Sequence, residues 1–344
     1  MKRHFVKITK LALILVYLVI IAGAVVRMTG SGMGCPDWPK CFGYYIPPTE
    51  QSQLEWQADK VYNKGQVIIW NETLKIAKTN FKTSASFTLE NWEDYTKHDY
   101  AVFNAFHTWT EFINRLMGAL AGLGTLLMAI VSLSFWRERK IIPVLSWLIV
   151  FGMGFQAWLG ATVVYSVLEP VKITIHMVMA LIIVAMILYT LFLVEKDDKK
   201  RIAPGFFKKL IVVSLLLTLI QIVFGTQVRQ FVDEQIDLVG EVSKNLWLFN
   251  PSVEFYIHRS FSILVVGINL LIFWRNKLGN LGYQKINWVL FLISLEVISG
   301  IMMYYMDFPF ASQPLHLVIA SVLFGIQFYL ILESGVLKKE KIRS

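Results

Sequence analysis

Three histidines in this sequence stand where ionisable side chains are rare. His176, His258 and His316 each lie in the first turn or two of an apolar run long enough to cross a membrane. An ionisable side chain inside a membrane is costly, so it indicates a functional site by default. For any one of them alone, the alternative is a hydrogen-bonded histidine at the membrane interface. Their recurrence at similar depth favours a shared role in binding.

The last two of these histidines, His258 and His316, lie on two runs of the second half of the chain. Facing helices of a four-helix bundle that each offer one imidazole form a paired-histidine site. Because no Cys or carboxylate pair lies at the same level, such a site suits heme iron better than zinc. Heme propionates also need cations, and four arginines lie at the same end of the runs: Arg27, Arg115, Arg229 and Arg259. The alternative for these arginines is snorkelling toward lipid phosphate.

The two halves of the chain repeat one pattern of residues. The equivalent positions are Gly23 with Arg27 and Gly225 with Arg229, Asn114 and His258, Gln156 with Gly160 and Glu296 with Gly300, and finally His176 and His316. Each copy spans four apolar runs, an even number, so both copies have the same orientation and are related by an axis along the membrane normal. We therefore predict two four-helix halves, residues 1–200 and 201–344.

The repeat is broken at one iron-binding position. His176 matches His316, but Asn114 stands where the second half has His258. Asn is a poor heme ligand, so the first-half pocket should hold iron by a single histidine. An open axial position suits substrate exchange or oxygen activation, whereas a paired-histidine site suits electron transfer.

A carboxylate marks the first half only. Glu111 lies one helical turn before Asn114, and the second half has Phe255 at the matching position. Glu111 is therefore a candidate acid–base group or stabiliser of positive charge, and the alternative is a carboxylate favoured by a helix N-terminus. His107 lies farther out on the same face and could be an axial ligand, a propionate or channel contact, or a structural residue.

The composition requires a membrane protein around these residues. The chain has 344 residues, of which 56% are hydrophobic and 17% charged, and its mean hydropathy is +0.54. Soluble domains carry about 25% charged residues, so a soluble fold is excluded. We predict an all-α integral membrane protein with eight transmembrane helices, at about 11–27, 111–135, 143–165, 173–194, 210–228, 255–274, 286–305 and 315–333.

The basic residues define a topology and not a nucleic-acid surface. Of the 33 Lys and Arg, 20 lie in alternate connections: 2–10, 137–140, 196–209, 275–285 and 338–343. The positive-inside rule places these segments, and hence both termini, in the cytoplasm. The net charge of +9 is thus explained by the membrane topology and by contact with anionic lipids of the bilayer. We expect no nucleic-acid partner. A cleaved signal peptide is the alternative for the first run, but that run carries the repeated Gly and Arg.

The two cysteines lie together outside the first apolar run. Cys35 and Cys41 flank a proline-containing loop on the side predicted to be outer. An oxidising compartment favours a disulfide between them, either structural or redox-active, and two cysteines alone are a weak metal site. The insertion 44–105 follows, without a repeat or a recognised motif, and should cover the first-half pocket or dock a partner.

Taken together, these residues resemble the heme A synthase family over residues 11–333. The strongest stretch runs from Gly23 to Pro39, GAVVRMTGSGMGCPDWP, and the segment around Glu111 and the three histidines follow in the family's order. The resemblance implies a bacterial inner-membrane enzyme that oxidises the C8 methyl of heme O to a formyl group, giving heme A for terminal oxidases. Heme O synthase, terminal-oxidase assembly and an unidentified electron donor or acceptor are the implied partners.

The resemblance also implies roles for single residues. His258 and His316 would ligate a prosthetic heme b, His176 would face the iron of the substrate heme, and Glu111 would be catalytic. The chain departs from the family at Asn114, where the family usually has His.

Two other functions stay open on the sequence alone. A membrane cytochrome with two bis-histidine hemes, passing electrons from quinol, would explain the histidine pairs, but it requires four axial histidines and Asn114 replaces one. A heme transporter or assembly factor would explain open pockets, but not a carboxylate at Glu111 in one half only.

Overall fold

The computed structural model describes residues 2–97, 102–195 and 203–336. Within these residues, eight helices are long and apolar enough to cross a membrane, which confirms the predicted class of a mainly helical membrane protein. They are α1 (Lys2–Met28), α2 (Ala105–Ser132), α3 (Ile141–Tyr165), α4 (Pro170–Val194), α5 (Gly205–Val239), α6 (Val253–Leu278), α7 (Lys285–Tyr305) and α8 (Ser312–Glu333).

Several helices extend beyond the apolar runs. α2 begins at Ala105 and not near Glu111, because the side chain of Asn104 caps it by accepting a hydrogen bond from the backbone N–H of His107. Glu111 therefore lies in the second turn of α2. α5 continues to Val239, well past the predicted end at 228, and carries charged residues into its last turns.

Some sequence predictions fall outside the described residues. These are His98, the basic segment 338–343, most of the connection 196–209, and the boundary between the halves at residue 200.

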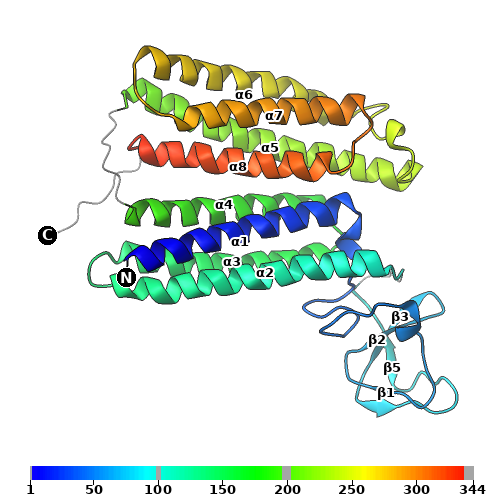
Figure 1. The fold of residues 1–344 in the computed structure, drawn as a ribbon. Helices are drawn as coiled ribbons and strands as arrows, with labels where there is room; N and C mark the ends of the chain where they lie inside the picture. The colour runs from blue at the N-terminus through cyan, green and yellow to red at the C-terminus, as the bar shows by residue number, and fades with distance from the viewer. Residues whose placement is uncertain (1, 98–101, 196–202, 337–344) are drawn as a thin grey trace.

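The eight helices run side by side in two groups of four (Figure 1). We call α1–α4 the first half and α5–α8 the second half. The end of the bundle where α1 begins and α8 ends is the terminal end, and the opposite end, beside the β-strands, is the sheet end (Figure 1). α4 and α8 are the most deeply buried spans, and α8 contacts α1, α4 and α5. These two helices therefore form the centre of the bundle, where the halves meet.

The connection between α1 and α2 contains short β-strands, which the sequence analysis did not predict. They form an antiparallel pair and an antiparallel three-stranded sheet in the order β2-β3-β5. The strands are β1 (Val61–Tyr62), β2 (Val67–Trp70), β3 (Thr73–Ala77), β4 (Phe81–Lys82) and β5 (Trp92–Asp94).

The β2–β3 hairpin turns at two residues with positive φ. Asn71 and Glu72 have φ of 48° and 61°, the conformation that matches the twist of a two-residue hairpin. Aromatic packing then fills the small sheet core: Trp70 stacks on Phe87 at 3.9 Å between ring centres, and Tyr62 packs on Trp92 at 5.0 Å. The insertion is therefore a folded unit and not an open loop.

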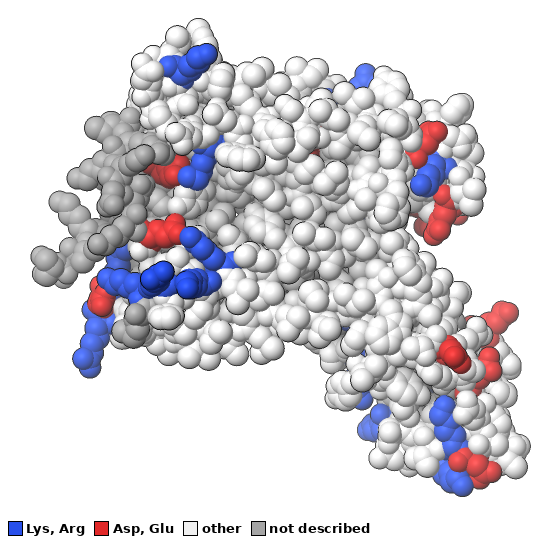
Figure 2. All heavy atoms as spheres, in the orientation of Figure 1, with Lys and Arg blue, Asp and Glu red and all other residues white. Residues whose placement is uncertain are grey.

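On the face shown in Figure 2, exposed charged side chains gather at the two ends of the bundle. Figure 2 shows Lys and Arg gathered at the terminal end, mixed charges on the strand-bearing region, and a helical surface between them that is almost free of charge. At the terminal end Lys2 pairs with Glu138, and Lys10 pairs with Glu195. An uncharged belt between charged ends is the surface that a bilayer requires.

Candidate functional site

The paired histidines of the second half lie close together between α6 and α8. The ring centres of His258 and His316 are 6.5 Å apart, with an angle of 69° between the ring planes. Each ring lies against a glycine: a Cβ added at Gly225 would lie 3.2 Å from Cε1 of His258, and one added at Gly300 would lie 3.8 Å from Cε1 of His316. Gly225 is therefore required for the close approach of His258, whereas a side chain at Gly300 would only touch the ring of His316.

The spacing fits an iron held between two imidazoles. With nitrogen about 2.0 Å from the metal and about 1.2 Å from its ring centre, two axial rings have centres about 6.4 Å apart. Among the described residues, no group of three or more His, Cys, Asp and Glu side chains is arranged to hold a metal ion. A two-histidine pocket of this kind suits heme, because the porphyrin supplies the other ligands.

His316 is fixed by two side chains of α7. Oε2 of Glu296 and Oγ of Ser299 lie 3.1 Å and 2.8 Å from Nδ1 of His316. The Ser299 hydroxyl donates to the backbone carbonyl of Glu296, so its oxygen accepts from the ring N–H. Both contacts engage Nδ1, which leaves Nε2 as the nitrogen available to a metal.

His258 and His176 are each contacted by a glutamine and not by a carboxylate. Nε2 of Gln221 donates to the carbonyl of His258 at 3.0 Å, and Nε2 of Gln156 donates to the carbonyl of His176 at 3.0 Å. Nε2 of Gln221 also lies 3.5 Å from Nε2 of the His258 ring. The Nδ1 atoms of both rings are buried without a hydrogen-bond partner in the described part of the chain.

The first half repeats the glycine packing but not the second histidine. A Cβ added at Gly160 would lie 3.5 Å from Cε1 of His176, and one added at Gly23 would lie 3.8 Å from Oδ1 of Asn114. That Oδ1 atom is also buried and lacks a hydrogen-bond partner among the described residues. Asn114 thus lies against Gly23 as His258 lies against Gly225.

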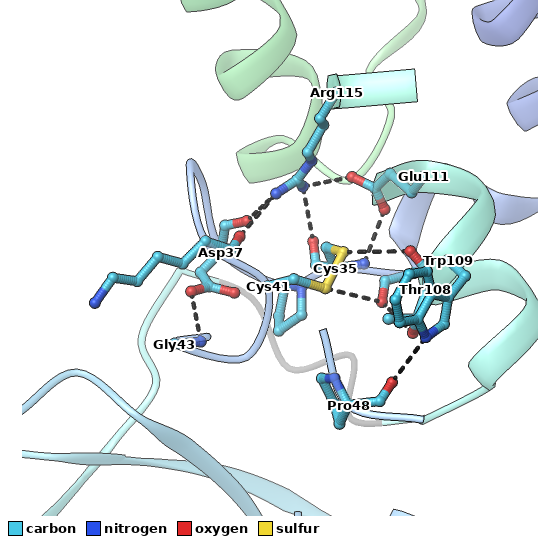
Figure 3. Close-up of a disulfide and its surroundings, with 12 residues drawn as sticks. Cys35, Asp37, Cys41, Gly43, Pro48, Thr108, Trp109, Glu111 and Arg115 are labelled. Atoms are coloured by element: carbon cyan, nitrogen blue, oxygen red, sulfur yellow. Dashed lines mark hydrogen bonds and ion pairs between the residues drawn. A yellow bond between two sulfur atoms is a disulfide. The ribbon is translucent and has the colours of Figure 1, made fainter. Parts of the chain in front are cut away.

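Glu111 is buried between α2 and the disulfide loop (Figure 3). Its Oε2 accepts a hydrogen bond from the backbone N–H of Cys35 at 2.8 Å, and its Oε1 lies 2.5 Å from NH2 of Arg115. Only 5% of its side chain is exposed. Because Glu111 lies beyond the first helical turn, the helix dipole does not explain it.

Cys35 and Cys41 form the predicted disulfide. The loop that it closes is fastened to α2 by Arg115, whose NH1 donates to the carbonyls of Asp37 and Lys40 at 2.6 Å and 2.8 Å. Asp37 in turn accepts from the backbone N–H of Gly43 at 2.8 Å. Burial raises the pKa of Asp37 above its ordinary value, although the Gly43 hydrogen bond and Arg115 both oppose that change.

The four arginines predicted as propionate partners have different surroundings. Arg115 is engaged by the disulfide loop, and Arg259 is exposed beside His258. Arg27 and Arg229 both pair with Asp233 of α5, at 3.0 Å and 2.7 Å, which joins the two halves at the sheet end. NH1 of Arg229 is buried without a hydrogen-bond partner among the described residues, so it is the guanidinium nitrogen best placed to receive an anion.

The sequence did not predict the roles of four polar residues. Gln156 and Glu296 were recognised as repeat positions, but neither they nor Gln221 were predicted to contact a histidine, although each lies four residues before a glycine of the repeat. That i, i+4 spacing was a readable signal. Asp233 had no such signal in the sequence, because it lies beyond the apolar run of α5.

His107 lies at the start of α2. Its described hydrogen bond is made by its backbone N–H, which donates to the side chain of Asn104.

The fold and the site together define a class of helical membrane protein in which histidines of one helix pack against glycines of a neighbouring helix. The chain belongs to the cytochrome oxidase assembly protein family, COX15-CtaA, whose model matches residues 7–328.

Several curated relatives share nearly the whole length of the chain. Heme A synthase of Flavobacterium psychrophilum is 22% identical over 92% of this chain and 93% of its own length. Heme A synthase of Wolbachia pipientis wMel is 23% identical over 92% of this chain and 88% of its own length. Heme A synthase of Rickettsia prowazekii is 24% identical over 91% of this chain and 92% of its own length. The resemblance to heme A synthases is therefore confirmed.

Proposed function

We propose that this protein is a heme A synthase that oxidises the C8 methyl group of heme O to a formyl group. The observation that carries the proposal is the contrast between the two pockets. One holds His258 and His316 at 6.5 Å between ring centres. The other offers His176, with Asn114 in the second axial position, and Glu111 lies one turn from Asn114. A site with both axial positions filled by histidine suits electron transfer, and a neighbouring site with one axial position free suits a heme that is itself oxidised.

We assign the second-half pocket to a prosthetic heme b. His258 and His316 would be its axial ligands, and Arg229 would receive a propionate through the unpaired NH1. Heme b, when bound, supplies a one-electron redox centre. The chain contributes ring orientation through Glu296 and Ser299, and an apolar helical wall that excludes water.

We assign the first-half pocket to heme O as the substrate. His176 would face the substrate iron, and Asn114 would leave the opposite face free for exchange. Conversion of a methyl to a formyl group removes four electrons and adds one oxygen atom, and we place it in two two-electron steps through an alcohol, with the electrons passing to an external acceptor. Glu111 would accept a proton or stabilise positive charge at the reacting carbon. The disulfide loop supports this role, because it holds the carboxylate in place and shields it from water.

We place the protein in the bacterial inner membrane with both termini in the cytoplasm. Support comes from the basic side chains at the terminal end and from the disulfide at the opposite end, since disulfides persist in oxidising compartments. Heme O synthase would supply the substrate, and terminal-oxidase assembly would consume heme A. An electron donor or acceptor completes the reaction.

Pigment extraction from the purified protein tests the proposal. We expect heme B together with heme O or heme A, whereas a bis-heme electron carrier would yield heme B alone. Replacement of His258 or His316 by Ala should abolish the low-spin bis-histidine spectrum, because each ring supplies one axial bond. His176→Ala should leave that spectrum largely intact. If all three variants affect heme b alike, the assignment of two different pockets is wrong.

A further inference from the structure

Three neighbouring positions on one face of α7 surround the ring of His316. Glu296 and Ser299 contact Nδ1, and Gly300, one turn after Glu296, leaves room for Cε1. The Glu296 side chain is only 16% exposed, and it lies inside a predicted span. A carboxylate at that depth is costly, so its position against a ring nitrogen demands a function.

The first half carries the same helix face with a different side chain. Gln156 occupies the position of Glu296, and Leu159 that of Ser299. Gln156 donates to the backbone carbonyl of His176 and leaves Nδ1 of that ring unpaired. Gln221 likewise donates to the backbone carbonyl of His258 and leaves Nδ1 of that ring unpaired among the described residues, although its amide nitrogen also lies 3.5 Å from Nε2 of the ring. Of the three histidines, His316 is therefore the one whose ring contacts a carboxylate.

We propose that Glu296 is a positioning residue that makes His316 a fixed and strongly donating axial ligand, and that Gln156 at the equivalent place keeps His176 a weaker, exchangeable one. This inference rests on the proposed assignment of heme b to the second half and substrate heme to the first. The pair would decide which half retains its heme and which half releases it.

The physical basis is the hydrogen bond on the nitrogen remote from the metal. An acceptor on Nδ1 fixes the tautomer and the ring plane, and it increases electron donation from Nε2 to the iron. A carboxylate is a stronger acceptor than an amide or hydroxyl. Stronger donation stabilises ferric over ferrous iron, so Glu296 should lower the midpoint potential of heme b. The unsupported ring of His176 should release its heme more readily.

The test compares Glu296→Gln with the reciprocal change Gln156→Glu in the purified full-length protein. Glu296→Gln gives the second half the side chain of the first half with almost no change in size. We expect heme b to dissociate about 10- to 100-fold faster, as for other residues that support metal ligands. Its midpoint potential, followed by spectroelectrochemical titration, should rise. A tenfold loss of preference for ferric iron corresponds to about 59 mV.

Gln156→Glu is the matched control for the second half and a test of the first. It should leave the heme b potential unchanged, because it lies against His176, and should raise the amount of heme O that co-purifies. Ser299→Ala removes the weaker acceptor and should shift the potential in the same direction as Glu296→Gln, but less. If Glu296→Gln does not accumulate, Gln156→Glu carries the test, because it places the same carboxylate against His176.

The outcomes separate this inference from the proposed function. An unchanged heme b potential and dissociation rate in Glu296→Gln would overturn the role of Glu296 while leaving the heme assignment intact. Where that variant does not accumulate, an unchanged heme O content in Gln156→Glu would do the same. A wild-type protein without low-spin heme, or a low-spin spectrum that survives His316→Ala, would overturn the proposed function itself.

Discussion

The carboxylate of Glu111 accepts a hydrogen bond from the backbone N–H of Cys35 at 2.8 Å, so the side chain proposed for catalysis also closes the disulfide loop onto α2. Arg115, one turn farther along α2, contacts Glu111 and the loop carbonyls together. A shift of the loop would therefore move Glu111. Chemistry and loop position are coupled at this end of the first half.

Replacing Glu111 with Gln should reduce product formation by at least about 10²-fold, by analogy with other positioned acid–base groups. Gln keeps an oxygen that can accept from Cys35, but it loses the negative charge that pairs with Arg115. Extracted pigments should contain heme O or its alcohol in place of heme A. The alcohol would place Glu111 in the second oxidation, and unreacted heme O in the first or in substrate positioning.

A suitable control is Glu254→Gln, which removes an exposed carboxylate from the first turn of α6. It should leave both pigments and product unchanged. The heme b spectrum should survive Glu111→Gln, because its ligands lie on other helices. Normal heme A content in the Glu111→Gln variant would show that Glu111 has no catalytic role and serves only to hold the disulfide loop.

Replacing Cys35 and Cys41 together with Ser should loosen the loop without removing heme b. The bond closes a loop with a sequence separation of 6, for which chain entropy predicts about 2 kcal/mol of stabilisation. Limited proteolysis of the segment between α1 and α2 should speed up, and product formation should fall less than in Glu111→Gln. Equal proteolysis rates with and without the disulfide would show that the hydrogen bonds from α2, including those of Glu111 and Arg115, hold the loop without it.

The membrane helices could be predicted because span length is a strong constraint. Each needs about 20 apolar residues, and runs of that length stand out against a charged content of 17%. The pocket residues of both halves followed from matched spacings, such as Gly160 to His176 and Gly300 to His316. Family membership and the Cys35–Cys41 disulfide are confirmed, whereas the division into halves at residue 200 stays a prediction.

The features that were missed depend on short or polar segments. Strands β1 to β5 are at most five residues long, and their clearest signal was the two-residue turn at Asn71 and Glu72. The predicted helix began at Glu111 because the residues before it are too polar to extend the apolar run. The helix itself begins earlier, at Ala105, because Asn104 caps it. Asp233 lies in the polar extension of α5, so hydropathy gave no reason to place it against Arg27.

The sidedness of the membrane helices can be tested by reporter fusions. A reporter placed between residues 50 and 97 should report the outer compartment, and one placed in the connection between α4 and α5 should report the cytoplasm. The reason is the asymmetry of Lys and Arg between the two ends. The same compartment for both reporters would contradict a topology with eight spans.

Asn114→His should convert the first-half pocket into a second paired-histidine site. The space exists, because Gly23 faces Asn114 as Gly225 faces His258, and a Cβ at Gly23 would lie 3.8 Å from Oδ1 of Asn114. In protein loaded with heme O, we expect the first-half iron to change from a single-histidine to a low-spin bis-histidine spectrum. Electron paramagnetic resonance would show this as a second low-spin signal beside that of heme b, and heme O should dissociate more slowly. His258→Asn provides the matched reverse change and should open the second-half site. If Asn114→His adds no low-spin signal, position 114 does not face the substrate iron and the open axial face has another cause.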